Sequence, residues 1–360
     1  MGDMAPYCGT KVARFFEKGK FYVKKSTTFV VDNQKMKVEG MELTRLCMDE
    51  SAWAPMTSGP SVATMGVFDG VHRGHLTLVE RVRQEATRRG LEAVAVTFAV
   101  NPATVVGRQA PRELLTLEER LDRLAAAGID RCVMLQFDRA MAALTAPQVM
   151  QRGLRDQLDV KVLVRGYDHR FGSDQRADAA YYEAEAQRLG MEVVTLPQLE
   201  DISSSAIRQR LAEGDVSGAN RMLGYDYPLS GVVTDGYRMG RKMGFPTANL
   251  DVAPTKMLPA DGVYAVRTLI HGRCYGGMMN IGPCPTFQNL DHRRPEVHLF
   301  DFDDDIYGMP ITLEFIKFLR LEFKMGSIDE LRAQLTTDAT TRQATMPRNP
   351  KSSKCGLPAN

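Results

Sequence analysis

Two histidines three residues apart follow an apolar run at 62–67 and lie among glycines. A strand that turns through glycines into a helix start exposes N–H groups and the positive end of the helix dipole to an anion. Imidazoles at such a turn can donate hydrogen bonds to charge on a phosphate. The spacing of His72 and His75 therefore predicts a nucleotide-phosphate site. The plainer alternative is a strand–helix turn with two partly exposed histidines. The loop residues that would contact the phosphates are Gly66, Phe68 and Gly74.

A second helix start, later in the chain, offers similar chemistry. Three consecutive serines occupy positions 203–205, and Arg208 lies one turn further on. Hydroxyl groups, free N–H groups and a guanidinium together could hold a triphosphate or a leaving pyrophosphate. The alternative is simple helix capping by a serine. Paired with the histidine turn, phosphate binding is the favoured interpretation, carried by Ser204, Ser205 and Arg208.

The second half of the chain contains another candidate site. A loop with Gly240 and Gly244 is followed by Thr247 and Asn249, whose side-chain oxygens suit a Mg²⁺–phosphate site. An ordinary loop with a proline turn is the alternative. Further on, Glu296 begins an apolar strand at a position where packing alone would favour Thr or Val. Its carboxylate is therefore a candidate functional group, and the alternative is an exposed glutamate on an edge strand.

Composition limits the kind of protein that holds these groups. The chain has 360 residues, enough for two domains, with 44% hydrophobic and 25% charged residues. A net charge of +2 predicts neither nucleic-acid nor membrane partners. No apolar run approaches the length needed to span a bilayer. Six scattered cysteines without a C-x-x-C motif are typical of free thiols. We therefore expect a cytoplasmic protein.

Strand and helix patterns alternate over the first domain, which we expect at 61–226. Alternation of this length predicts a parallel sheet covered on both faces, and ligands bind beyond the carboxyl ends of such strands. The histidine turn lies at such an end. A capping box, Thr116 with Glu119, predicts the start of one helix. The expected strands are 62–67, 91–98, 131–137, 161–165 and 192–196, and the expected helices are 116–127, 147–158, 177–189 and 215–223.

The second domain, expected at 227–335, has a different pattern. Short apolar segments punctuated by glycine and proline predict a small antiparallel β-barrel, closed by a helix at 327–335. Residues 1–60 show no sustained periodicity, and we expect an N-terminal extension of unknown role there. The tail at 336–360 is expected to be disordered. The expected barrel strands are 229–234, 262–268, 273–280, 296–302 and 311–319.

With both phosphate motifs in place, the sequence resembles the nucleotidylyltransferase superfamily. More narrowly, it resembles the prokaryotic bifunctional riboflavin kinase/FMN adenylyltransferase family, over roughly 62–335. The segments 137–145 and 166–172 resemble family segments at the flavin and nucleotide pocket. The segment 240–250 resembles the riboflavin kinase signature around Pro-Thr-Ala-Asn. Blocks at 259–264, 280–282 and 296–302 follow in the family's order. The resemblance implies a Rossmann-like α/β domain followed by a riboflavin kinase barrel.

The resemblance also implies roles for the candidate residues. His72 and His75 would steady the phosphates of ATP, with Ser204, Ser205 and Arg208 assisting. Thr247 and Asn249 would help to bind Mg²⁺ and ATP phosphate, and Glu296 would be the general base. The substrates would be riboflavin, FMN and ATP, and both reactions would need Mg²⁺. The implied flavin-binding residues are Asp168, Phe171 and Asn280.

The chain departs from the family pattern at two places. Relatives usually carry Pro-His-Pro after the second strand, where this chain has Asn101 before Pro102. Relatives commonly have Thr-Arg where this chain has Pro283 and Cys284. Two other functions stay open: a monofunctional riboflavin kinase with a degenerate first domain, and a flavin- or nucleotide-binding regulator without turnover.

Overall fold

Seven strands of the first domain form one sheet in the computed structural model of this chain, in the order β1-β2-β5-β4-β3-β6-β7. The strands β2 to β7 run parallel to their neighbours, and β1 runs antiparallel to β2. The structure describes residues 35–38, 40–47, 59–174, 178–197, 199, 201–234, 247–283 and 293–321. The strands are β1 (Lys35–Val38), β2 (Met41–Cys47), β3 (Ser61–Met65), β4 (Glu92–Phe98), β5 (Arg131–Gln136), β6 (Val160–Gly166) and β7 (Glu192–Leu196).

This sheet confirms the predicted α/β domain and corrects one expectation. Two of its strands, β1 and β2, come from the segment 1–60 that we expected to be a separate extension. The strand β2 pairs with β5 from Glu42 to Cys47, and Met41 and Leu43 are buried in the core. Its apolar residues alternate over only a few positions, which is too short a stretch to give a clear periodic signal.

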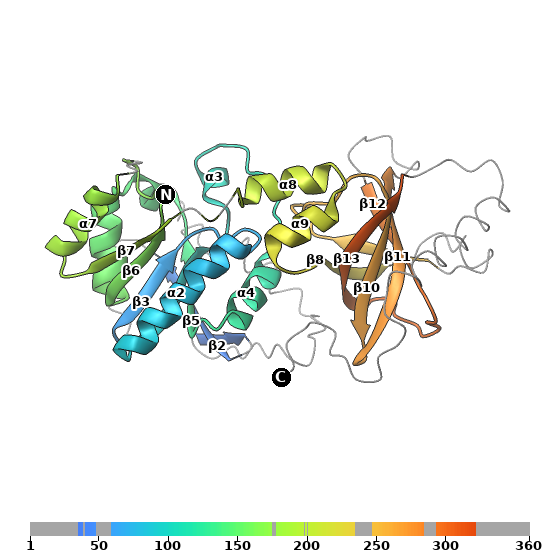
Figure 1. Cartoon of the computed structure of the whole chain (residues 1–360), viewed down its shortest axis with the longest axis horizontal. Coiled ribbons are helices and arrows are strands. Elements are labelled where there is room, and N and C mark those ends of the chain that lie inside the picture. The colour runs from blue at the N-terminus through green and yellow to red at the C-terminus, as the bar shows by residue number, and fades with distance from the viewer. Residues whose placement is uncertain are drawn as a thin grey trace, which may run out of the picture.

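Helices cover both faces of the sheet (Figure 1). Adjacent strand residues such as Val62 and Ala63 point to opposite faces and enter two different cores. One core contains apolar residues of α2 and α4, and the other contains residues of η1 and α7. The helices are α2 (Arg73–Arg89), α3 (Pro102–Val105), α4 (Leu117–Ala126), α5 (Arg139–Ala143), α6 (Ala146–Gln148), the π-helix η1 (Val149–Gln157) and α7 (Ala179–Arg188).

The predicted helix starts have the expected local chemistry. Thr116 and Glu119 form the capping box of α4, each side chain bonding the other's backbone N–H. The helix expected at 147–158 is formed as α6 followed by η1, whose hydrogen bonds span five residues instead of four.

The second domain is a closed barrel with the strand order β10-β11-β12-β9-β8-β13, and every pair in it is antiparallel. This confirms the predicted antiparallel barrel. The strand β9 was not expected, because its segment was interpreted as a loop. The predicted helix at 327–335 and the tail lie outside the described residues, as do Gly240, Gly244 and Cys284. The barrel strands are β8 (Tyr227–Thr234), β9 (Ala248–Val252), β10 (Gly262–Ile270), β11 (Arg273–Pro283), β12 (Arg293–Leu299) and β13 (Pro310–Arg320).

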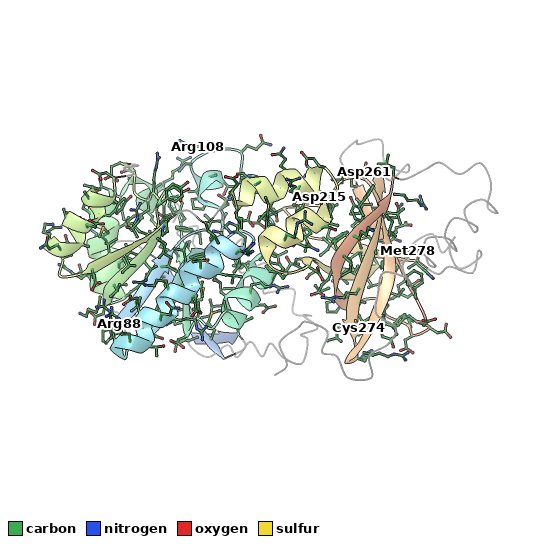
Figure 2. All side chains as sticks on the ribbon, viewed as in Figure 1. Arg88, Arg108, Asp215, Asp261, Cys274 and Met278 are labelled. Atoms are coloured by element: carbon green, nitrogen blue, oxygen red, sulfur yellow. The ribbon has the colours of Figure 1, made fainter. Side chains whose placement is uncertain are left out.

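Two short helices, α8 (Ser204–Ala212) and α9 (Val216–Leu223), lie between the sheet and the barrel (Figure 1). Asp215, labelled in Figure 2 between these helices, caps α9 by accepting a hydrogen bond from the Gly218 N–H at 2.8 Å. The buried Leu211 and Leu223 belong to the same core as the barrel strands. Within the described residues, no helix is long and apolar enough to cross a membrane.

Two candidate active sites

The histidine loop, residues 66–75, joins β3 to α2 through a strongly curved backbone. Phe68, Gly70 and Val71 have φ angles of 51°, 88° and 34°, in or near the left-handed region. This region is unfavourable for Phe and Val, so the surrounding contacts must hold the loop in place. Both side chains are buried, at 1% and 0% exposure. The Phe68 ring belongs to the core, so only its backbone remains as a candidate phosphate contact.

His72 is the N-cap of α2, and its Nδ1 accepts a hydrogen bond from the His75 N–H at 3.4 Å. In the neutral imidazole the proton then lies on Nε2, which is left as a donor. The two imidazole rings stack with their centroids 3.8 Å apart and 16° between their planes. A Cβ on Gly74 would lie 3.2 Å from both Nδ1 and Cε1 of His72, so the imidazole would have to shift by a few tenths of an ångström to admit a side chain.

The electrostatics of the loop favour uncharged imidazoles. Burial lowers the pKa of His72 to about 4. Burial, with His72 and His169 nearby, lowers the pKa of His75 well below its ordinary value. The Nδ1 atom of His75 is buried and has no hydrogen-bond partner within the described residues. At neutral pH the pair therefore presents N–H dipoles. A bound phosphate would favour protonation of the same rings.

The start of α8 contacts the histidine loop at Asp69. Ser203 caps the helix, its hydroxyl accepting from the Ala206 N–H at 3.1 Å. The Ser204 hydroxyl donates to the Asp69 carbonyl at 2.7 Å. Arg208 forms an ion pair with the Asp69 carboxylate. Ser204 and Arg208 thus contact Asp69 of the histidine loop, although more than 130 positions separate them from it in the sequence. The Ser204 hydroxyl and Arg208 fasten the loop, whereas Ser205 is exposed at the helix start.

A third histidine, His169, belongs to the same region and was missed as a site residue. Burial, with Arg165 beside it, lowers the pKa of His169 to about 4. The charge of His169 also contributes to lowering the pKa of His75. Histidine spacing within one turn could not reveal it, because it lies 94 positions after His75. The available signal was a histidine shortly after a predicted strand, where ligands bind in a parallel sheet.

The predicted flavin residues after β6 have different surroundings. Asp168 is exposed. Phe171 is only 8% exposed, and its ring packs against Tyr182 with the centroids 5.0 Å apart. The exposed aromatic ring of this loop is Tyr167, at 46% exposure. A flavin ring at this edge would therefore meet Tyr167 more directly than the buried Phe171.

Asn101, where the resemblance led us to expect a histidine, has a local role. It caps α3, and its side-chain oxygen accepts a hydrogen bond from the Ala103 N–H at 3.0 Å. This use of the side chain is typical of asparagine at helix starts.

The kinase candidates lie in one row across three barrel strands. The pairing register sets Asn249 of β9 opposite Glu296 of β12, and Glu296 opposite Asn280 of β11. Residues opposed in this way share a face of the sheet. The alternate residues Leu250, Val297 and Met279 fill the barrel core, so the polar row lies on the outer face. Thr247 directly precedes β9, two positions before Asn249.

This row has the chemistry of a shared magnesium site. Hydroxyl, amide and carboxylate oxygens are the ligand types that Mg²⁺ accepts, usually a few from protein with the rest from water and phosphate. Within the described part of the chain, no group of three His, Cys, Asp or Glu could hold a metal by itself. The oxygen donors of the row are of the types that an ion shared with nucleotide phosphates would accept.

Two family models match this chain. The model described as FAD synthetase matches residues 54–209. The model described as riboflavin kinase matches residues 223–346. The first match covers the histidine loop and the start of α8, and the second covers the whole barrel.

Curated relatives match both domains together. The bifunctional riboflavin kinase/FMN adenylyltransferase of Haemophilus influenzae is 36% identical over 78% of this chain and 92% of its own length. The Escherichia coli protein of that name is 36% identical over 78% of this chain and 91% of its own length. The Bacillus subtilis protein of that name is 35% identical over 77% of this chain and 90% of its own length. The crystal structure of a macrolide-efflux protein from Streptococcus pneumoniae is 31% identical, with a TM-score of 0.75, and covers 83% of this chain and 98% of that chain.

Proposed function

The chain belongs to the bifunctional riboflavin kinase/FMN adenylyltransferase family, and on that premise we propose how its two sites divide the chemistry. The barrel transfers the γ-phosphoryl group of ATP to riboflavin, giving FMN and ADP. The sheet domain transfers the adenylyl group of a second ATP to FMN, giving FAD and pyrophosphate.

In the kinase reaction, Glu296 is the general base. Its carboxylate takes the proton from the riboflavin 5′-hydroxyl as that oxygen attacks the γ-phosphorus, and the bond to ADP breaks. Thr247 and Asn249 would hold Mg²⁺, which would neutralise charge on the phosphates. Asn280, next to Glu296 in the row, positions the flavin. The pairing register across β9, β12 and β11 supports these assignments.

In the adenylyl transfer, a phosphate oxygen of FMN attacks the α-phosphorus of ATP, and pyrophosphate leaves. His72, through Nε2–H, and His75 donate hydrogen bonds to the phosphate oxygens as charge builds on them. Ser204 and Arg208 hold the histidine loop, and Ser205 contacts phosphate from the start of α8. Positioning and electrostatics carry this reaction, and well-oriented reactants can save about 7–11 kcal/mol.

The observation that carries the proposal is the stacked pair of neutral imidazoles at the start of α2, with Nε2 of His72 left to donate. One observation favours a second candidate, a chain that only phosphorylates riboflavin. Asn101 stands where relatives have a histidine, and its oxygen is engaged in capping α3.

Chromatography of the flavins formed from riboflavin, ATP and Mg²⁺ distinguishes these functions. We expect FMN and then FAD. FMN alone would identify the monofunctional kinase, and unchanged riboflavin would identify a binding protein. Removing Mg²⁺ with a chelator should stop both steps.

Two substitutions test the division between sites. His75→Ala should lower FAD formation from FMN by about 10²–10³-fold, the effect of losing one charge-stabilising donor, and should leave riboflavin phosphorylation intact. Glu296→Gln should stop phosphorylation and leave FAD formation from supplied FMN intact. If either substitution stopped both reactions in a folded protein, the two-site assignment would be wrong.

A further inference from the structure

We infer that Tyr225 and Lys256, which lie outside the sheet, are positioning residues for adenylyl transfer because they hold the histidine loop from the barrel side. The inference rests on the proposed adenylyl-transfer site. It adds two residues that belong to neither phosphate motif.

Tyr225 lies in the short connection between α9 and β8 and contacts the loop directly. Its hydroxyl donates a hydrogen bond to the carbonyl oxygen of Gly70, two residues before His72. The guanidinium carbon of Arg123 lies 3.8 Å from the centroid of the Tyr225 ring. Burial raises the pKa of Tyr225, so the hydroxyl keeps its proton and remains a donor. The hydrogen bond therefore fixes the curved backbone at Gly70.

Lys256 acts through the segment beside the loop. It lies between β9 and β10, and its side chain is fully buried. Its ammonium donates to the Leu114 carbonyl at 2.7 Å and pairs with Glu119 of α4. The N–H groups of Leu114 and Leu115 in turn donate to one carboxylate oxygen of Asp69, at 2.8 and 3.3 Å. A barrel-side cation therefore fixes the backbone that holds Asp69.

These contacts bear on catalysis because the loop is strained. Phe68 and Val71 have positive φ angles that persist only where the surroundings enforce them. The restrained atoms, the Asp69 carboxylate and the Gly70 carbonyl, lie between these two residues. Releasing either atom lets the loop relax and moves His72 and His75 relative to the phosphates. A displacement of about 1 Å at a catalytic group can lower a rate about 100-fold.

The substitution Tyr225→Phe removes one hydroxyl and keeps the ring beside Arg123. We expect kcat for FAD formation to fall about 10- to 100-fold. The KM for FMN and the rate of riboflavin phosphorylation by the same molecules should stay unchanged. Loss of folded protein would give another pattern, because it would lower both activities together.

Tyr264→Phe is the matched control. Tyr264 is a buried barrel tyrosine whose hydroxyl donates to the Ala260 carbonyl at 2.6 Å, away from the histidine loop. We expect both activities of this variant to match those of the unmodified chain. The double variant Glu119→Gln/Lys256→Met replaces the buried ion pair by neutral groups of similar size. It should reproduce the selective loss seen with Tyr225→Phe.

Amide hydrogen exchange gives a readout independent of catalysis. Exchange in residues 66–75 should become faster in Tyr225→Phe and should stay unchanged in Tyr264→Phe. Unchanged FAD formation and unchanged exchange in Tyr225→Phe would overturn the inference, as would an equal fall in both activities. Absence of FAD formation by the unmodified chain would instead overturn the proposed function, and the exchange comparison would still decide whether Tyr225 holds the loop.

Discussion

Gly74 matters because of its position against the His72 ring, and it supplies a direct test at the scale of one residue. An added Cβ would lie 3.2 Å from the imidazole, so Gly74→Ala should shift His72 relative to the His75 ring on which it stacks. We expect FAD formation to fall at least about tenfold, with riboflavin phosphorylation unchanged. Rates of both reactions, measured on one preparation, check this.

Gly59→Ala is the control for that substitution, because no atom lies within 4 Å of the added Cβ. It should leave both rates unchanged. A Gly74→Ala chain that formed FAD at the normal rate would show that the orientation of His72 is not required.

His72 also predicts how stability depends on pH. Its pKa is about 4 in the folded chain, against an ordinary value of 6.5. Between these values the unfolded chain binds more protons, so the folded state loses stability as the pH falls. From pH 7 to pH 5 this group should remove about 2 kcal/mol of unfolding free energy.

The comparison for this prediction is His72→Asn, which keeps a good helix cap and removes the titrating group. Urea unfolding at pH 7 and pH 5 should show a smaller loss for the variant, by that same amount. Equal losses in the two proteins would contradict the assigned pKa of His72.

The types and spacing of single residues indicated where the candidate sites lie. They did not indicate the contacts that those residues make in the folded chain. The histidine spacing indicated a helix start, and His72 does cap α2. The sequence could not show that Arg208 is engaged with Asp69, because the partner lies 139 positions away. Nor could it show that Phe171 is buried against Tyr182. Such contacts depend on tertiary packing, which leaves no local pattern in a single sequence.

At the scale of elements, the β11–β12 pair determines whether Glu296 and Asn280 stay aligned. Gly277 in β11 faces Leu299, and a Cβ there would lie 2.6 Å from the backbone oxygen of His298. Because backbone cannot swing aside as a flexible side chain can, Gly277→Ala should force β12 away from β11. Riboflavin phosphorylation should fall, together with the free energy of unfolding.

The internal control for Gly277→Ala is the other domain of the same chain. FAD formation from supplied FMN should persist at temperatures where the barrel stays folded. Unfolding experiments and both assays check this, and normal phosphorylation would show that the row tolerates a shifted register.

Long periodic elements were the predictable ones. The seven-residue strand β4 was expected at 91–98 and spans Glu92–Phe98, and α4 begins at its predicted capping box. The strand β9 was missed because its residues, Ala-Asn-Leu-Asp-Val, directly follow a glycine-rich motif and alternate over only five positions. β1 and β2 were missed for a similar reason, since short strands depend on their neighbours for stability.

At the scale of the whole molecule, a buried ion pair joins the two domains. Lys256 and Glu119 lie 137 positions apart, and Glu119 also accepts a hydrogen bond from the Ser230 N–H of β8 at 3.1 Å. Composition predicted two domains but not that a capping-box glutamate of one would pair with a lysine of the other. Through this ion pair, the geometry of the histidine loop in the sheet domain depends on the barrel.

This pair yields a double-mutant cycle. Lys256→Met alone leaves a buried carboxylate without its counter-charge, and Glu119→Gln alone leaves a buried ammonium, so each should lower the unfolding free energy by about 3–5 kcal/mol. The double variant should lose less than the sum of the two single losses, because no uncompensated charge remains buried. Urea unfolding of the four proteins measures the coupling, and additive losses would show that the pair does not join the domains energetically.

The same cycle has a pH signature that separates charge from packing. Burial lowers the pKa of Lys256, and the charge of Glu119 opposes that shift. In Glu119→Gln the opposing charge is gone, so the folded chain binds fewer protons than the unfolded chain as the pH rises. Stability then increases with pH, and the deficit of Glu119→Gln should be smaller at pH 9 than at pH 7. The double variant has no ammonium at this position, so its deficit should not change over that range. A constant deficit in Glu119→Gln would mean that lost packing, and not the buried charge, destabilises the variant.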